Sequence, residues 1–235
     1  MSNIDNLEHY PMPDLDPAPA VTEQERWDKV WDDVGSKAGH QRVNQDSGEV
    51  EWYTPKWLLD RVKRVLGDID LDPASCSTAN LSVEAKQFFT PEDDSLNRDW
   101  NGVVWMNHPY GKGEKACRKL KGTFGEYRCK KNACKARGYH IDYDVPGNTE
   151  WVAKFVNEFM IGNITKAGCI TFASTSENWF RPLYNFHQVW LYDRVAFVDK
   201  DGNEGKQTTK GSVLTFMGVN KQDLEREFAD IGKVK

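Results

Sequence analysis

The sequence predicts an α/β domain that carries an N-terminal extension and a basic insertion containing Cys and His. Three observations support this prediction. Helical and strand-like patterns alternate between residues 51 and 111, as they do in domains built on a parallel sheet. Residues 103–106 form a short β-branched and aromatic run that ends at polar Asn107, as expected for a buried strand. Finally, positive charge gathers in residues 112–140, although the 235-residue chain has a net charge of −5.

The first 50 residues are predicted to form an acidic arm followed by a helix. Residues 1–21 are rich in Pro and Asp and lack periodicity, which is typical of an extended arm. A capping box begins at Thr22, four apolar residues at helical spacing follow it, and Gly35 can end the helix. This segment holds 11 acidic and 4 basic side chains, a net charge of −7. Its helix is expected either to dock on the domain or to bind a partner.

The main domain, residues 51–220, is predicted to open with a helix. Thr54 suits its N-cap, Pro55 its first helical position and Gly67 its end. Five elements should follow in order: a strand (68–72), a loop of small residues (73–80), a helix (84–89), a polar connection (91–100) and the strand before Asn107 (103–106). After the insertion we expect a helix (148–159), a strand (167–174), a second helix (179–184) and two strands (189–192 and 194–198). A turn (201–203) and a returning strand (212–217) should complete the domain.

The C-terminal segment, residues 221–235, is predicted to be a helix that is amphipathic over 221–230. The chain has no run of about 18 apolar residues, so no transmembrane helix and no membrane partner are expected. Its N-terminus lacks the features of a secretory signal. We therefore expect a cytoplasmic protein whose five cysteines stay reduced.

The polar tip Asn107-His108-Pro109-Tyr110 is the leading candidate for a catalytic site. Pro109 and Gly111 make the chain turn here, and open α/β sheets bind ligands at the carboxyl ends of their strands. The Asn107 side-chain oxygen and the His108 main-chain carbonyl can each accept a hydrogen bond from one N–H group of an exocyclic amine. This would favour the positive charge that develops when the amine takes a methyl group. Tyr110 can stack on a base and contact a cationic methyl donor. The alternative is an ordinary Asn-x-Pro turn.

Six stretches carry a resemblance to a known family: Trp52-Tyr-Thr-Pro55, Asp70-Leu-Asp-Pro-Ala74, Phe88-Phe-Thr90, Asp93-Asp94, Trp100 and Trp105-Met-Asn-His-Pro-Tyr-Gly111. In these stretches the sequence resembles the phage-encoded DNA N6-adenine methyltransferases, the Dam-like phage family of AdoMet-dependent enzymes. The resemblance runs from about residue 51 to residue 218. It implies a Rossmann-like methyltransferase sheet, and a reaction at the N6 amine of adenine in DNA after the base is flipped out.

The resemblance also implies roles for individual residues. The family's Asn-Pro-Pro-Tyr motif matches Asn107 to Tyr110, with His108 in place of a proline, so the main-chain carbonyl is kept and the rigidity of the ring is lost. One set of residues would line the AdoMet pocket: Tyr53, Thr54, Pro55, Asp72, Pro73 and Ala74. One of the acidic pair Asp93 and Asp94 is expected to assist.

Residues 112–140 contain ten basic and two acidic side chains, a net charge of +8. Because this charge adjoins the polar tip and is interleaved with aromatic residues, we expect it to contact DNA. The residues expected to do so are Lys119, Lys121, Arg128, Lys130, Lys131, Lys135 and Arg137. A solvated charged loop is the alternative.

The same insertion, residues 112–147, holds three of the five cysteines and a histidine: Cys117, Cys129, Cys134 and His140. Three Cys and one His form a known structural zinc set, although none of these spacings is the usual short knuckle. The sequence therefore predicts a structural zinc site, with free thiols on a surface loop as the alternative. Two other functions stay open: a related methyltransferase acting on RNA or protein glutamine, and a catalytically inactive, zinc-containing DNA-binding protein.

Overall fold

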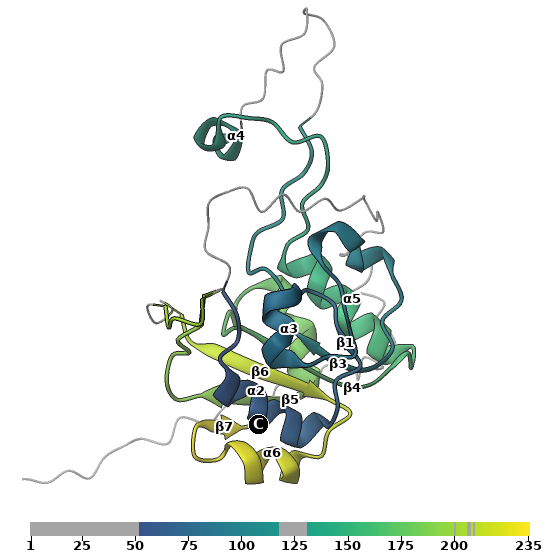
Figure 1. Ribbon diagram of the computed structural model, residues 1–235, viewed down its shortest axis with the longest axis vertical. Coiled ribbons are helices and arrows are strands. Elements are labelled where there is room, and N and C mark those ends of the chain that lie inside the picture. Colours follow the sequence, from purple (N-terminus) through teal and green to yellow (C-terminus); the bar gives the residue numbers. More distant parts are fainter. Residues whose placement is uncertain (1–51, 118–130, 200, 206–207, 209) are drawn as a thin grey trace, which may run out of the picture. The chain divides into compact units, whose positions relative to one another are not determined.

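The computed structural model describes residues 52–117, 131–199, 201–205, 208 and 210–235 (Figure 1). The predicted acidic arm and helix of residues 1–50 lie outside this part of the chain. Within it, five α-helices and three 3-10 helices are present: α2 Lys56–Leu66, α3 Ser77–Val83, α4 Asn132–Arg137, α5 Asn148–Met160, α6 Lys221–Phe228, η1 Pro91–Asp93, η2 Ser95–Asn97 and η3 Asn178–Asn185. None of these helices is long and apolar enough to cross a membrane.

Seven strands among the described residues form one sheet in the order β2-β1-β3-β4-β6-β5-β7. Their bounds are β1 Leu71–Asp72, β2 Gln87–Phe88, β3 Gly102–Met106, β4 Ile164–Phe172, β5 His187–Leu191, β6 Ser212–Met217 and β7 Gly232–Val234. The first four in this order run parallel, whereas β6, β5 and β7 each pair antiparallel with their neighbours. The predicted α/β class is confirmed, and the carboxyl ends of β1 to β4 share one edge.

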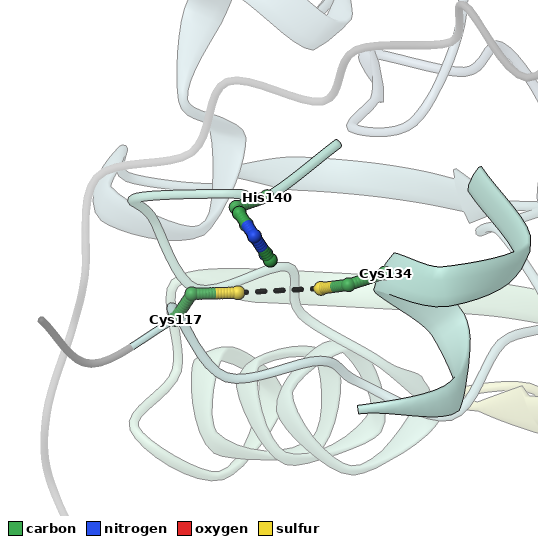
Figure 2. Close-up of side chains that lie close together, drawn as sticks. All are labelled: Cys117, Cys134 and His140. Atoms are coloured by element: carbon green, nitrogen blue, oxygen red, sulfur yellow. Dashed lines mark hydrogen bonds between the residues drawn. The ribbon is translucent and has the colours of Figure 1, made fainter. Parts of the chain in front are cut away.

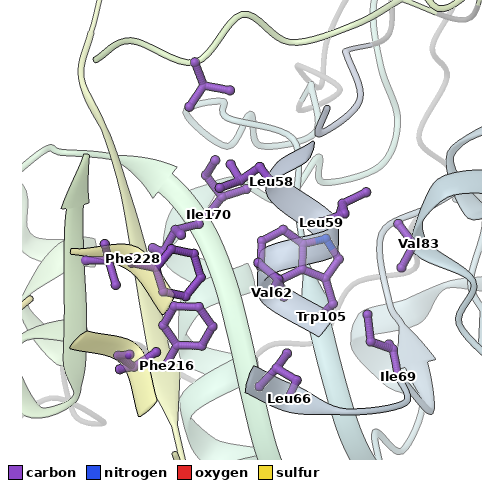
Figure 3. Close-up of a cluster of buried hydrophobic side chains, with 14 of the residues drawn as sticks. Leu58, Leu59, Val62, Leu66, Ile69, Val83, Trp105, Ile170, Phe216 and Phe228 are labelled. Carbon is purple, nitrogen blue, oxygen red and sulfur yellow. The ribbon is translucent and has the colours of Figure 1, made fainter. Parts of the chain in front are cut away.

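The main core lies between α2, α6 and one face of the sheet. Four apolar residues of α2 recur at helical spacing and are all buried: Leu58, Leu59, Val62 and Leu66. Figure 3 shows them with side chains of the sheet and of α6: Trp105, Ile170, Phe216 and Phe228. Full burial of each such side chain stabilises the fold by about 1.5–3 kcal/mol. α5 packs against β4 but contributes nothing to this cluster, so it covers the opposite face.

The segment after β1 differs from the prediction. The small-residue loop at 73–80 gives way to α3 at Ser77, and the helix predicted at 84–89 is absent, replaced by β2. Asn80 explains the change, because its carboxamide bonds both the N–H and the carbonyl of Ala85. Glu84 adopts a left-handed conformation at φ 58° and ends α3. The chain can then turn back and pair with β1.

The C-terminal segment also corrects the prediction of a helix over residues 221–235. α6 ends at Phe228, and the last residues form β7, an edge strand that pairs with β5. Gly232 permits this close pairing, since a Cβ there would lie 2.8 Å from Val189 Cγ1 and 2.9 Å from the Trp190 carbonyl oxygen. Residues 194–198 were predicted as a strand, but with the described residues they form isolated bridges through Val198, to Tyr53 and Glu204, and no named strand.

Candidate functional site

Asn107 to Tyr110 follow β3 at the point where the strand order of the sheet reverses. β2 lies on one side of β1, and β3 lies on the other. The loops after β1 and β3 therefore leave the sheet side by side and diverge. In open α/β sheets such a switch point forms the crevice in which ligands bind.

Tyr110 is folded back against the carboxyl edge of the sheet. Its hydroxyl oxygen lies 2.7 Å from Asn107 Oδ1 and 3.0 Å from the Ile170 carbonyl oxygen of β4. Its ring packs on Phe172 and Phe197, with centroids 4.6 and 6.1 Å away. Burial raises the pKa of Tyr110 well above its ordinary value, so the hydroxyl keeps its proton. The carboxamide of Asn107 is thus tied to β4 through Tyr110.

His108 is 2% exposed, and its Nε2 lies 2.8 Å from Oδ1 of Asn148, the first residue of α5. Burial lowers its pKa to about 4, against the opposing effect of the Asn148 hydrogen bond. The ring is therefore neutral at pH 7, and with the proton on Nε2 it donates to Asn148. Nδ1 has no hydrogen-bond partner among the described residues. This bond restrains the motif at His108.

The residues predicted to line a cofactor pocket gather at the same edge of the sheet. Asp72 ends β1, and its Oδ1 accepts a hydrogen bond from Ala74 N at 3.1 Å. The Cys76 thiol donates to the Tyr53 hydroxyl at 3.3 Å, which joins the segment before α2 to the loop after β1. Tyr53 also pairs with Val198, next to Phe197, whose ring contacts Tyr110 of the polar motif.

Thr54 and Asp72 are both buried and polar, and each is unusual for its position. Thr54 was predicted to cap α2, but Pro55 occupies the N-cap and no side chain caps the helix. The buried Thr54 hydroxyl has no partner within the described residues. Burial raises the pKa of Asp72 to about 7, although the Ala74 amide and the Ser75 side chain lower it.

Asp93 and Asp94 follow β2, next to β1 on the same edge. Oδ2 of Asp93 accepts hydrogen bonds from the N–H and the hydroxyl of Thr90, both at 2.8 Å, and these bonds lower its pKa. Asp93 therefore stabilises the 3-10 turn that follows β2. Asp94 is left-handed at φ 50° and accepts from Asn97 Nδ2 at 2.8 Å.

The insertion departs from the sheet and returns to it beside the polar motif. Asn148 N donates to the Gly111 carbonyl at 3.0 Å. A Cβ at Gly147 would overlap Gly113 N and lie 2.7 Å from the Gly111 carbonyl oxygen, so only glycine allows the two chain segments to approach this closely. Glu114 and Val145 then pair across the base of the insertion.

The structure brings together three of the four predicted metal ligands: Cys117, Cys134 and His140 (Figure 2). Cys129 lies outside the described residues. So do four residues predicted to contact DNA: Lys119, Lys121, Arg128 and Lys130. Lys135 and Arg137 lie in α4, and their side chains are outside the description. The Lys131 ammonium lies 3.8 Å from Glu114 Oε1 and also contacts the Lys115 carbonyl.

Three residues of the site were not identified from the sequence: Asn148, Phe172 and Phe197. Asn148 begins the helix predicted at 148–159, so in the sequence this residue indicated only where that helix starts. Its partner His108 is 40 residues away, a separation that no local pattern reveals. Phe172 and Phe197 belong to apolar stretches in which every aromatic residue suggests core packing.

The fold and the site define an α/β protein with a polar motif at the switch point of its sheet. The chain belongs to the family described as DNA N-6-adenine-methyltransferase (Dam), whose sequence model matches residues 42–231. It is 35% identical over 60 residues to the DNA N-6-adenine-methyltransferase of Haemophilus phage HP1 (strain HP1c1), a match covering 25% of this chain and 34% of that protein. The chain thus aligns with about a third of that relative's length. No solved structure matches it significantly.

Proposed function

We propose that this protein transfers a methyl group from AdoMet to the N6 amine of adenine in DNA. The observation that carries the proposal is the pair of restraints on the polar motif at the switch point. Tyr110 joins Asn107 to β4, and Asn148 holds His108. Family membership supports the choice of adenine and DNA. The strand order and its switch point favour a Rossmann-like methyltransferase sheet spanning residues 51–220, completed by β7.

The proposed reaction needs two acceptors held in place before the methyl group moves. Asn107 Oδ1 and the His108 main-chain carbonyl would each accept a hydrogen bond from one N–H group of the adenine amine. These bonds make the nitrogen a better nucleophile and stabilise the positive charge that develops on it. Such acceptors act without reorganisation only if they are already fixed, which is what the contacts to Tyr110 and Asn148 provide.

The hydrogen of the Tyr110 hydroxyl decides where the Asn107 oxygen points. A hydroxyl carries one hydrogen, and the Ile170 carbonyl, 3.0 Å away, can only accept. We therefore assign the Tyr110 hydroxyl as the donor to the Ile170 carbonyl. The amino group of Asn107 then faces the Tyr110 oxygen and donates to it, because the O and N atoms of a carboxamide are assigned from their hydrogen-bond partners. Oδ1 then points away from Tyr110 and is left to accept from the substrate amine.

Thr54 and Asp72 suit AdoMet as a cofactor. The buried, unpartnered Thr54 hydroxyl can bond a polar group of the cofactor. Burial raises the pKa of Asp72 to about 7, so the group titrates near neutral pH, and a nearby cation would favour the carboxylate. When bound, AdoMet supplies an electrophilic methyl group on a positively charged sulfonium. The remaining residues of the proposed pocket are Tyr53, Pro55, Pro73 and Ala74, with Asp94 on the neighbouring turn.

Adenine inside a duplex cannot reach Asn107, so we propose that the target base is flipped out of the helix. Tyr110 is half-buried, and its ring would then stack on the base. The basic insertion lies next to the motif through the Gly111–Asn148 contact and would track the DNA phosphates. For a phage-encoded DNA methyltransferase, the expected place of action is the cytoplasm of the bacterial host.

The test is transfer of labelled methyl from AdoMet to DNA, followed by digestion to nucleosides and mass spectrometry. We expect the label in N6-methyladenine, and its loss in Asn107→Ala protein that still binds AdoMet in calorimetry. Label found only in RNA or in protein glutamine would indicate a related methyltransferase instead. Absence of AdoMet binding by the wild-type protein would indicate an inactive DNA-binding protein.

A further inference from the structure

We propose that Cys117, Cys134 and His140 bind a zinc ion that stabilises the insertion of residues 112–147. Figure 2 shows the three side chains converging from different parts of the insertion. The two sulfur atoms lie 3.3 Å apart, and one ligand atom from each residue lies within 4.8 Å of the others. Both cysteines are buried, whereas His140 is exposed. This site is independent of the proposed methyl transfer.

The backbone of the insertion explains how residues so far apart in sequence converge. Cys117 N donates to the Ile141 carbonyl at 2.7 Å, which sets Cys117 beside the residue that follows His140. Cys134 lies in the first turn of α4. Gly138 then ends α4 in a left-handed conformation at φ 83°, with its N–H bonded to the Cys134 carbonyl. This turn directs the chain from Cys134 back toward Cys117.

The distances suit a tetrahedral zinc site better than a disulfide. Zinc binds Cys sulfur at about 2.3 Å and His nitrogen at about 2.0–2.1 Å, so tetrahedral ligand atoms lie roughly 3.6–3.8 Å apart. The observed sulfur separation of 3.3 Å needs only a small adjustment to reach this. A disulfide would require closure to about 2.05 Å and would give His140 no role.

The described residues of the insertion, 112–117 and 131–147, form only a small core. Their hydrophobic cluster contains three buried residues, two of which are the cysteines, and two partly buried ones: Cys117, Cys134, Ile141, Tyr143 and Val145. Segments with so small a core usually need a metal or a disulfide to order them. Structural zinc supplies this free energy directly, because the metal binds only when its ligands are brought together.

Zinc binding would change the protonation of the ligands and the contacts of Cys134. Each cysteine releases its thiol proton when its sulfur bonds zinc, while neutral His140 donates a nitrogen lone pair. The Cys134 thiol donates to Glu114 Oε1 at 3.8 Å, and the same carboxylate oxygen lies 3.8 Å from Lys131 Nζ. On zinc binding the Cys134 sulfur would exchange this hydrogen bond for a bond to the metal. Cys129 remains a prediction from the sequence as a fourth ligand, and the proposal rests on the other three.

The test is to measure the zinc content of the full-length, untagged protein by elemental mass spectrometry. The protein is purified without chelators. We expect about one zinc per chain, falling at least about tenfold in Cys117→Ser/Cys134→Ser. The zinc content should also be clearly reduced in His140→Gln, which replaces the imidazole with a carboxamide at an exposed position. Cys76→Ser is the matched control, a cysteine outside the insertion, and should keep its zinc. Replacing zinc with cobalt should give a thiolate-to-cobalt absorption band that the double variant lacks.

Several outcomes would overturn the proposal. The protein could be free of zinc and bind none when titrated with zinc ions. The Cys117→Ser/Cys134→Ser protein could retain as much zinc as the wild type. Peptide mapping could instead find a Cys117–Cys134 disulfide in freshly purified, metal-free protein. None of these results would affect the methyl-transfer assay, so this proposal and the proposed function can fail separately.

Discussion

The His108–Asn148 hydrogen bond gives a sharp prediction for catalysis. In Asn148→Ala, the acceptor 2.8 Å from His108 Nε2 is removed, while the main-chain bond from residue 148 to Gly111 can persist. His108 is then left with a buried N–H that has no partner. Leaving such a group unpaired costs about 1–3 kcal/mol. We expect the free energy of unfolding to fall by this amount, or the motif to move to regain a partner.

Movement of the motif would displace the His108 carbonyl, the proposed acceptor for the adenine amine. If the full 1–3 kcal/mol appears in the transition state, kcat falls roughly 5- to 150-fold. AdoMet affinity should not change, because Thr54 and Asp72 are untouched. Both quantities are accessible, kcat from steady-state methyl transfer and affinity from calorimetry. The exposed neighbour Thr149 provides the matched control, Thr149→Ala, for which we expect wild-type kcat and stability.

A double-variant cycle makes this test specific. His108→Pro restores the family residue and supplies rigidity through the ring, so it should make Asn148 unnecessary. We expect Asn148→Ala to slow the wild-type protein but to leave kcat nearly unchanged in the His108→Pro background. Equal slowing in both backgrounds, or wild-type kcat in the Asn148→Ala single variant, would refute the positioning role of Asn148.

Four further predictions concern the site and its surroundings. Asn107→Ala should lower kcat by about 10²–10³ with AdoMet binding retained in calorimetry, and a nearly normal kcat would contradict its role. Tyr110→Phe should lose less activity than Tyr110→Ala, which also loses base stacking worth about 1–3 kcal/mol; equal activities would exclude stacking. Asp72 has its pKa raised from 3.8 to about 7, so its contribution to stability is present below pH 4 and lost as the pH rises through 7. Relative to Asp72→Asn, the wild type should lose up to about 4 kcal/mol over that range in urea titrations, and parallel pH profiles would disprove this. Gly147→Ala should destabilise the protein by about 1–3 kcal/mol through overpacking, whereas unchanged thermal unfolding would show that the base of the insertion relaxes freely.

Elements with a strong apolar period were predictable from the sequence. α2 was expected because its buried residues recur at helical spacing and Gly67 ends it, and the structure confirms this helix. β3 was expected from its apolar run and the polar tip that follows. In both cases local preference and burial in the core favour the same structure, so tertiary packing did not alter the outcome.

α3 shows why other elements were not predictable. Only Val83 of this helix is buried, and Leu81 is 79% exposed, so it has no apolar stripe to detect. Its N-cap is Cys76, whose sulfur accepts from Ala79 N at 3.4 Å, and cysteine is not among the usual capping residues. The position of the polar motif was predictable from β3 and Pro109, but the contact that holds His108 depends on tertiary structure alone.

The closed base of the insertion gives the protein a modular construction. Residues 112–147 begin and end where Gly111 O and Asn148 N are 3.0 Å apart, so the chain could omit or exchange this segment without re-routing any strand of the sheet. Two properties could then evolve separately: the chemistry at the switch point, and whatever the insertion recognises. Under the proposed function, grafting a different insertion between Gly111 and Asn148 should leave the reaction unchanged and alter the choice of target.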